Sequence, residues 1–213
     1  SMFKKYWKFF VIFWSVVLVG IIGVFVFFWL ISAGKLGFMP TFEELENPNN
    51  RFASEVYFAD GPIMNRYFEK ENRKYIEYRE IPQSVIDALI ATEDVRFYDH
   101  SGVDVRGLFR VAKGLLTANT SAGGGSTISQ QLAKMLFPRE SDLNVFELAI
   151  RKFREWVIAV RLEKSYTKEE ILTMYLNKYD FLNLAVGISS AADIYFQVPL
   201  DSLKVEQAAM LIG

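Results

Sequence analysis

The sequence predicts a mainly α-helical domain that follows one N-terminal transmembrane helix and a short β-hairpin. An uncharged, apolar run covers residues 9–34 and is long enough to be that membrane helix. Two β-prone runs flank Asp60-Gly61, a favoured hairpin turn. From Pro82 onward, apolar residues recur at the spacing of amphipathic helices. We therefore expect an anchor, a connector and one helical domain, in that order.

The apolar run at residues 9–34 has the length and the flanks of a membrane span. About 20 apolar residues cross the hydrocarbon core, so this run crosses it with some tilt. Interfacial aromatics lie near its ends: Trp7, Trp14 and Trp29. Lysines precede it at positions 4, 5 and 8, whereas only Lys35 closely follows it, so the positive-inside rule places residues 1–8 in the cytoplasm and the rest outside. A cleavable signal peptide is the alternative, but the run is too long and no clear small-x-small site follows it.

The remaining chain divides into a connector at residues 35–80 and a helical domain at residues 81–213. The connector begins with a stretch rich in Pro, Asn and Glu. The expected hairpin strands follow at residues 54–58 and 63–68. No helix-ending signal precedes Gly213, so we expect the domain to continue beyond it.

Local signals mark the helices of residues 81–213. Pro82 suits a first turn, and an apolar face follows it: Val85, Ile86, Leu89 and Ile90. Capping boxes open further helices: Thr127-x-x-Gln130, Thr167-x-x-Glu170 and, more loosely, Asn144-x-x-Glu147. Apolar stripes run behind two of them: Ala149, Phe153, Trp156, Val157 and Val160, then Ile171, Leu172, Tyr175 and Leu176. Asp201 or Ser202 is expected to cap a last helix.

Composition excludes several classes of function. The formal net charge is −1, so a basic nucleic-acid footprint is not expected. The chain has no cysteine, which excludes disulfides, thiolate metal sites and a cysteine nucleophile. It has one histidine, so a His-rich metal site within one chain is excluded as well.

Glu93 and Asp94 come at the end of the first predicted helix and are followed by aromatic residues. A carboxylate that is partly desolvated beside aromatic rings has a raised pKa, which suits a general base. The alternative is a pair of solvated acids at a helix end, and chemistry alone favours it.

The run Gly123-Gly-Gly-Ser-Thr127 leads into a helix that starts near Ile128. Free N–H groups at a helix start attract anions, and Lys134 adds a positive charge one to two turns later. A flexible glycine linker capped by Thr127 is the alternative. The spacing is not that of a P-loop, because no Gly-Lys-Ser/Thr follows.

A charged segment follows at Arg151-Lys152-Phe-Arg-Glu155. Arg151 and Glu155 are four residues apart and share a helix face, so a surface ion pair is the bland interpretation. The functional interpretation places Glu155 and its cations beside a pyrophosphate. For His100, a structural hydrogen-bonding role is favoured over a role in binding.

The order of these motifs is more specific than any one of them. Glu93-Asp-x-x-Phe97-x-x-His100-x-Gly102, Gly124-Gly-Ser-Thr-Ile-Ser-Gln-Gln131, Arg151-Lys-x-x-Glu155 and Tyr175-Leu-Asn177 resemble the signature set of glycosyltransferase family 51. That family includes the N-terminal module of class A penicillin-binding proteins and the monofunctional peptidoglycan glycosyltransferases. The resemblance covers about residues 53–213.

The resemblance implies a lysozyme-like, two-lobed α-helical fold that polymerises lipid II into glycan strands. The acceptor 4-hydroxyl would attack C1 of the lipid-pyrophosphate-linked donor, with Glu93 and Glu155 as the catalytic carboxylates. Glu93 would take the hydroxyl proton, and Glu155 would orient the pyrophosphate. The residues implied in substrate binding are Asp94, Phe97, His100, Gly124, Gly125, Ser126, Thr127, Gln130, Gln131, Lys134, Arg151, Lys152 and Asn177.

The same resemblance bears on cofactors and partners. Mg²⁺ or another divalent cation is the only cofactor considered, with Glu155 as its candidate ligand, and no organic cofactor is expected. The expected partners are lipid II, the lipid-linked glycan chain, the bacterial cytoplasmic membrane and cell-wall synthesis proteins, with no nucleic acid. Four apolar residues between the first two motifs belong either to a membrane-dipping surface or to the core: Leu108, Phe109, Leu115 and Leu116.

Two segments depart from the family pattern. Residues 137–146 lack the usual short basic stretch, which leaves Arg139 as the candidate for a second phosphate-binding cation. Residues 180–185 lack the usual glycines. Two other classes of function compete with glycosyl transfer. One is a lytic hydrolase on the same fold, which needs no pyrophosphate site, and the other is a non-catalytic scaffold, which needs neither Glu93 nor Glu155.

Overall fold

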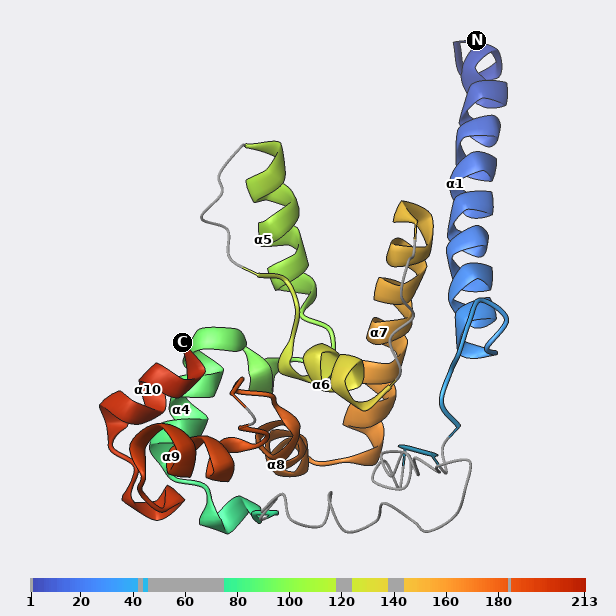
Figure 1. Cartoon of the computed structure of the whole chain (residues 1–213). Coiled ribbons are helices and arrows are strands. Elements are labelled where there is room, and N and C mark those ends of the chain that lie inside the picture. The colour runs from blue at the N-terminus through green and yellow to red at the C-terminus, as the bar shows by residue number, and fades with distance from the viewer. Residues whose placement is uncertain (1, 42–43, 46–74, 118–123, 138–143, 184) are drawn as a thin grey trace, which may run out of the picture. The chain divides into compact units, whose positions relative to one another are not determined.

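The computed structural model describes residues 2–41, 44–45, 75–117, 124–137, 144–183 and 185–213, and these are mainly helical as predicted (Figure 1). The α-helices are α1 Met2–Ser32, α4 Gln83–Glu93, α5 Val105–Leu116, α6 Ile128–Leu136, α7 Val145–Ser165, α8 Lys168–Lys178, α9 Ile188–Phe196 and α10 Val205–Ile212. Short 3-10 turns are η2 Tyr78–Glu80, η3 Phe97–Asp99 and η5 Leu200–Ser202. The predicted hairpin, Gly123 and Arg139 lie outside the described residues.

The chain groups into two compact units. The first comprises Ser1–Met39 and Ser141–Val157, and the second comprises Pro40–Glu140 and Ile158–Gly213. Helix α7 therefore contributes its first part to one unit and its last part to the other. The candidate residues are divided in the same way, because Arg151, Lys152 and Glu155 fall in the first unit and the others in the second.

The first unit contains the predicted membrane helix. Tyr6–Ser32 within α1 is the one segment of the described residues that is long and apolar enough to cross a membrane. Its helix begins at Met2, so the described part of the predicted tail is helical too. Near the other end, the rings of Phe27 and Phe28 meet Phe153 of α7 edge to face, with centroids 5.4 and 5.7 Å apart. The apolar stripe predicted around Phe153 thus serves partly to pack α7 against α1.

The second unit is a small bundle around α6 and α8. Helix α4 begins after Pro82, as predicted, and buries Val85, Ile86 and Leu89. Helix α10 packs against α4, and α6 packs against α8, which also contacts η2 and α9. The predicted stripe on α8 is buried in full: Ile171, Leu172, Tyr175 and Leu176. Burying a large aliphatic side chain contributes about 1.5–3 kcal/mol, so this stripe anchors the bundle.

The capping predictions have mixed outcomes. The box at Thr167 is confirmed, with Glu170 N–H donating to Thr167 Oγ1 and Thr167 N–H donating to Glu170 Oε2. The box at Asn144 is confirmed in the same reciprocal form. At Thr127 only the first half forms: its hydroxyl accepts the Gln130 N–H, but the Gln130 side chain donates to Gly102 O instead.

The predicted cap of the last helix is wrong. Asp201 and Ser202 lie in η5 instead. Leu200, the first residue of this turn, and Leu203, which follows it, are buried and hold the turn against the bundle. Helix α10 starts three residues later, where the Lys204 N–H donates to Gln207 Oε1.

Candidate active site at the junction of α4 and α6

Glu93 is the last residue of α4 and lies half-buried beside α6 and α8. Gln131 Nε2 donates to Glu93 Oε2 at 2.5 Å, and the Tyr175 hydroxyl donates to Gln131 Oε1 at 3.0 Å. Among the described residues, this is the one hydrogen bond to the Glu93 carboxylate. Its second oxygen, Oε1, therefore remains available to accept a proton from a ligand.

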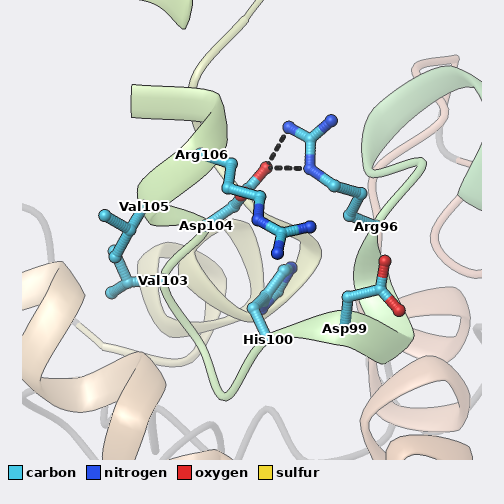
Figure 2. A pocket seen from close by; sticks show the side chains of 7 residues that line it. All are labelled: Arg96, Asp99, His100, Val103, Asp104, Val105 and Arg106. Atoms are coloured by element: carbon cyan, nitrogen blue, oxygen red, sulfur yellow. Dashed lines mark hydrogen bonds and ion pairs between the residues drawn. The ribbon is translucent and has the colours of Figure 1, made fainter. Parts of the chain in front are cut away.

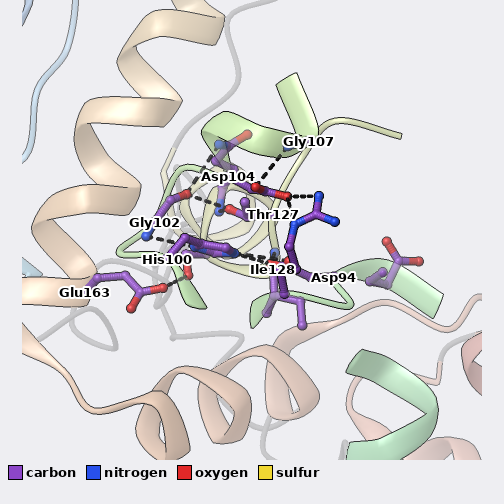
Figure 3. A network of polar contacts seen from close by, with 12 residues as sticks. Asp94, His100, Gly102, Asp104, Gly107, Thr127, Ile128 and Glu163 are labelled. Atoms are coloured by element: carbon purple, nitrogen blue, oxygen red, sulfur yellow. Dashed lines mark hydrogen bonds and ion pairs between the residues drawn. The ribbon is translucent and has the colours of Figure 1, made fainter. Parts of the chain in front are cut away.

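Asp94 is the next residue, and it is buried with internal partners (Figure 3). One of its oxygens accepts the Ile128 N–H at 3.1 Å, and both lie within 3.1 Å of His100 Nε2. The other ring nitrogen of His100 accepts the Gly102 N–H at 3.2 Å. Since Nδ1 accepts, the imidazole hydrogen is on Nε2 and points at Asp94. Both nitrogens of His100 are thus used inside the protein, which fits its structural interpretation.

The start of α6 is occupied by this internal carboxylate. Asp94 accepts the N–H of Ile128, the first helical residue, and Thr127 accepts the N–H of Gln130. These are the groups that the sequence analysis offered to a phosphate. Because Asp94 already places a negative charge at the positive end of the helix, a substrate anion has little left to bind there.

Gly102 holds the loop that brings His100 and Thr127 together. Its φ of +99° is in the left-handed region, and a Cβ there would lie 2.8 Å from Ala159 C and Val160 N in α7. Its carbonyl accepts the Thr127 hydroxyl at 2.6 Å and Gln130 Nε2 at 3.3 Å. Only glycine allows the loop to approach the α7 backbone this closely.

A half-buried lysine, Lys168, braces the same loop from α8. Lys168 Nζ donates to the His100 carbonyl at 2.7 Å and to Glu163 at 2.8 Å, and it lies 4.2 Å above the Phe97 ring. Glu163 also accepts the Ser129 hydroxyl at 2.5 Å. The motif residues Phe97 and His100 are therefore fixed by a charge pair that was not predicted.

Lys134 lies on the same face of α6 as Gln131, about 4.5 Å further along the helix axis. It is exposed, and no partner is found for it among the described residues. Gly124 is exposed before the helix, and a Cβ on it would meet nothing within 4 Å. A Cβ on Gly125 would lie 3.3 Å from Val111 of α5. Lys134 on α6 and Gly124 before it are thus accessible to solvent, and Lys134 is one turn along the helix from the residue that contacts Glu93.

A cavity of about 490 Å³ lies on the other side of His100 (Figure 2). It is lined by Arg96, Asp99, His100, Val103, Asp104, Val105 and Arg106. Arg96 Nη2 and Nε reach Asp104 Oδ2 at 2.5 and 3.1 Å, and this pairing, helped by the Gly107 N–H, holds the pKa of Asp104 below its usual value. The rim carries both signs of charge, so the cavity alone does not select an anion.

In the first unit, Glu155 is buried and paired. Lys152 Nζ lies 2.8 Å from Glu155 Oε2. The cation that pairs with Glu155 in the described residues is therefore Lys152, three residues before it, rather than the predicted Arg151. The described residues hold no group of three acidic or histidine side chains placed to bind a metal ion.

Asn177 acts as a clamp between α8 and residue 76. Its Oδ1 accepts the Ile76 N–H at 3.0 Å, and its Nδ2 donates to the carbonyls of Ile76 at 2.9 Å and Thr173 at 2.8 Å. The amide is thus used by the backbone, and its predicted role in substrate binding is untested.

Three residues of this site, Tyr175, Glu163 and Lys168, were given no role in it by the sequence. Tyr175 was named in the fourth family motif and in an apolar stripe without a role of its own, although a buried tyrosine needs a partner for its hydroxyl. Glu163 and Lys168 are five residues apart across a capped helix start, a spacing with no local rule. The need of the Tyr175 hydroxyl for a partner could have been inferred from the sequence, whereas the pairing of Glu163 with Lys168 could not.

Together, the fold and the site define a class of protein: a helical domain that follows a membrane-length helix in the chain and holds a half-buried carboxylate, Glu93, at a helix end. A family model described as transglycosylase matches residues 60–213. The chain belongs to this transglycosylase family, glycosyltransferase family 51, as its motif order predicted.

The chain is also similar in sequence to curated proteins named penicillin-binding protein 1A. Over 175 residues, 82% of this chain, it is 37% identical to penicillin-binding protein 1A of Escherichia coli K12 and 37% identical to the protein of that name from Pseudomonas aeruginosa. It is 36% identical over the same length to penicillin-binding protein 1A of Neisseria lactamica. The matches cover 20% to 21% of those proteins, so the chain spans about a fifth of the length of the relatives it matches.

Proposed function

We propose that this domain polymerises lipid II into peptidoglycan strands at a membrane surface. The observation that carries the proposal is the environment of Glu93, a half-buried carboxylate with one oxygen bonded to Gln131 and the other available. Membership of the transglycosylase family supplies the reaction class. Lys134, one turn along α6 from Gln131, would supply a positive charge for a pyrophosphate, and a lytic hydrolase would not need that charge.

In the proposed reaction, Glu93 Oε1 accepts the proton of the acceptor 4-hydroxyl as its oxygen attacks the donor C1. The bond from C1 to the pyrophosphate oxygen breaks, and the lipid pyrophosphate leaves with the electron pair. A positioned general base contributes about 10²–10⁴-fold. Lys134 would stabilise the departing charge, together with the loop Gly124–Ser126 rather than the first N–H groups of α6, because Asp94 and Thr127 already use those.

We assign Glu155 to the donor pyrophosphate. Its close pairing with Lys152 makes it a poor base but lets it position cations. Mg²⁺ can be held by one carboxylate, phosphate oxygens and water, so a cation on Glu155 is compatible with the residues present, although no step depends on it. Glu155→Gln should change the affinity for a donor-mimicking phosphoglycolipid and its dependence on Mg²⁺. Equal affinities for variant and parent, with and without Mg²⁺, would contradict the assignment.

We also propose that α1 crosses the bacterial cytoplasmic membrane with its N-terminus inside and the domain outside. The lysines before the apolar run support this orientation. Exposed Phe109 and Leu116 on α5 are suited to contact with the same bilayer. A reporter fused after Gly213 should be active only outside the cytoplasm, and activity inside would refute the orientation.

The decisive experiment supplies the full chain, in detergent, with labelled lipid II. Glycan polymer should form, and it should not form with Glu93→Gln. Polymeric glycan offered without lipid II serves as the second arm. Cleavage of that glycan, without polymerisation of lipid II, would instead identify a lytic hydrolase.

A further inference from the structure

Three helices contribute one side chain each to a chain of hydrogen bonds that ends on Glu93. It starts in the core at Tyr175 of α8, which is 2% exposed. The tyrosine hydroxyl donates to Gln131 Oε1 of α6 at 3.0 Å, and Gln131 Nε2 donates to Glu93 Oε2 of α4 at 2.5 Å. No other partner is found for the Glu93 carboxylate in the described residues, so this chain is what orients it.

The direction of both hydrogen bonds is fixed by chemistry. An ionised carboxylate only accepts, so the amide of Gln131 must turn its NH₂ group toward Glu93 and its oxygen toward Tyr175. The tyrosine must then donate. Burial first, and the charge of Glu93 second, raise the pKa of Tyr175 above its ordinary value, which favours the protonated hydroxyl as the donor. The Tyr179 ring stacks on Tyr175 with centroids 5.3 Å apart and holds its ring.

We propose that Tyr175 is a positioning residue for Glu93, acting through the side-chain amide of Gln131. This rests on the proposed function, in which Glu93 is the general base. The carboxylate sets the direction of the amide, and the hydroxyl holds the amide in place by donating to its oxygen. Gln131 Nε2 therefore stays within reach of Oε2, which fixes the carboxylate and leaves Oε1 toward the acceptor hydroxyl. Without the hydroxyl, the amide oxygen loses its partner in the core, and the Gln131 side chain can move away from Glu93.

Few other charges bear on Glu93. Asp94 follows it on α4, but that carboxylate is paired with His100. Lys134 on α6 and Glu206 on α10 are exposed to solvent, as are Glu169 and Glu170 at the far end of α8. Lys178 is the last residue of α8 and Tyr179 is its C-cap, and both follow Tyr175 in the chain. Removing the Tyr175 hydroxyl changes none of these groups, so a shift in Glu93 titration reports the hydrogen-bond chain.

The experiment compares Tyr175→Phe with Tyr179→Phe in the full chain. A donor that favours the charged carboxylate lowers its pKa, so loss of orientation raises it. Tyr175→Phe should move the acid limb of the polymerisation rate to higher pH by about half a pH unit, and Gln131→Met should move it by about one. The KM for lipid II should stay unchanged in Tyr175→Phe, and Tyr179→Phe should resemble the parent.

The double variant, Tyr175→Phe with Gln131→Met, tests whether Tyr175 acts on Glu93 through Gln131. If Tyr175 acts only through Gln131, Tyr175→Phe adds nothing to Gln131→Met. An acid limb that stays in place in Tyr175→Phe, or a further shift in the double variant, overturns the proposal. Carbon-13 NMR titration of Glu93 gives the same shift without catalysis. A parent chain that fails to polymerise lipid II would therefore refute the proposed function while the titration still decides the role of Tyr175.

Discussion

The two carboxylates at the end of α4 lie in regions of opposite character. Asp94 belongs to a buried junction, in which His100, Gly102, Thr127 and Lys168 hold one another in place. Glu93 belongs to an open side, where one glutamine contacts it and Lys134 stands in solvent. Adjacent carboxylates therefore serve different purposes, because the backbone leaves the helix at Asp94 and directs the two side chains to different surroundings.

This difference shows how the site is assembled. The buried junction saturates the start of α6 and locks the loop after α4, so that Glu93 and Lys134 are presented on a rigid frame. A positioned acid or base needs such support from its neighbours. The buried junction should therefore control stability, and the open side should control catalysis. Substitutions in the two regions should therefore separate stability from catalysis.

The largest effect is expected from Glu93→Gln. The amide keeps the shape and still accepts from Gln131, but it is not basic. Polymerisation of labelled lipid II should fall at least ~10²-fold, while thermal unfolding in detergent changes little. A variant that polymerises at near the parent rate would remove Glu93 from the role of base.

Asp94→Asn should show the opposite pattern. Its charged acceptor serves the Ile128 N–H and His100 in a buried setting, and hydrogen bonds to charged groups are worth about 1.5–3 kcal/mol. We expect a loss of that size in the free energy of unfolding, measured by denaturant titration. Asp87→Asn, on the exposed face of the same helix, is the control and should stay within about 0.5 kcal/mol. Equal free energies of unfolding for both variants would contradict the inference that the buried junction controls stability.

Lys134→Met tests the open side alone. Loss of one charge-assisted contact should weaken binding of a donor-mimicking phosphoglycolipid about tenfold. Stability should be unchanged, because Lys134 is exposed. Lys164→Met, at an exposed position near the end of α7, provides a matched loss of charge. Identical affinities for the two variants would mean that Lys134 does not face the donor.

The smallest effect is expected at the Arg96–Asp104 pair. Since the folded pKa of Asp104 is lowered, its contribution is complete above its unfolded pKa of about 3.9 and is lost as the pH falls through the folded value. Asp104→Asn should therefore lower the free energy of unfolding near pH 7 by at most about 1 kcal/mol. The difference from the parent should vanish in strong acid. A difference that grows as the pH falls would have the wrong sign for this pairing.

Patterns within a few residues predicted the helices, whereas contacts between residues far apart in the sequence determine the geometry of the site. The α4 start at Pro82, the Thr167 box and the buried stripe on α8 all depend on residues within a few positions. By contrast, Asp94 meets Ile128 across 34 residues, and Gln131 meets Glu93 across 38. No periodicity reports such pairings. The family motifs named residues that the structure brings together around α4 and α6, but they could not say that Asp94 accepts the first N–H of α6.

The clamp between Asn177 and Ile76 has a consequence for how the domain folds. These partners are 101 residues apart, and two hydrogen bonds of the amide tie the backbone of Ile76, just before η2, to α8, while a third stays within α8. Closing so long a loop becomes favourable only after the intervening helices have ordered. The Ile76 amide should thus be among the last to gain protection during refolding. In the native state, its hydrogen exchange should require opening of the whole bundle rather than fraying of its edge.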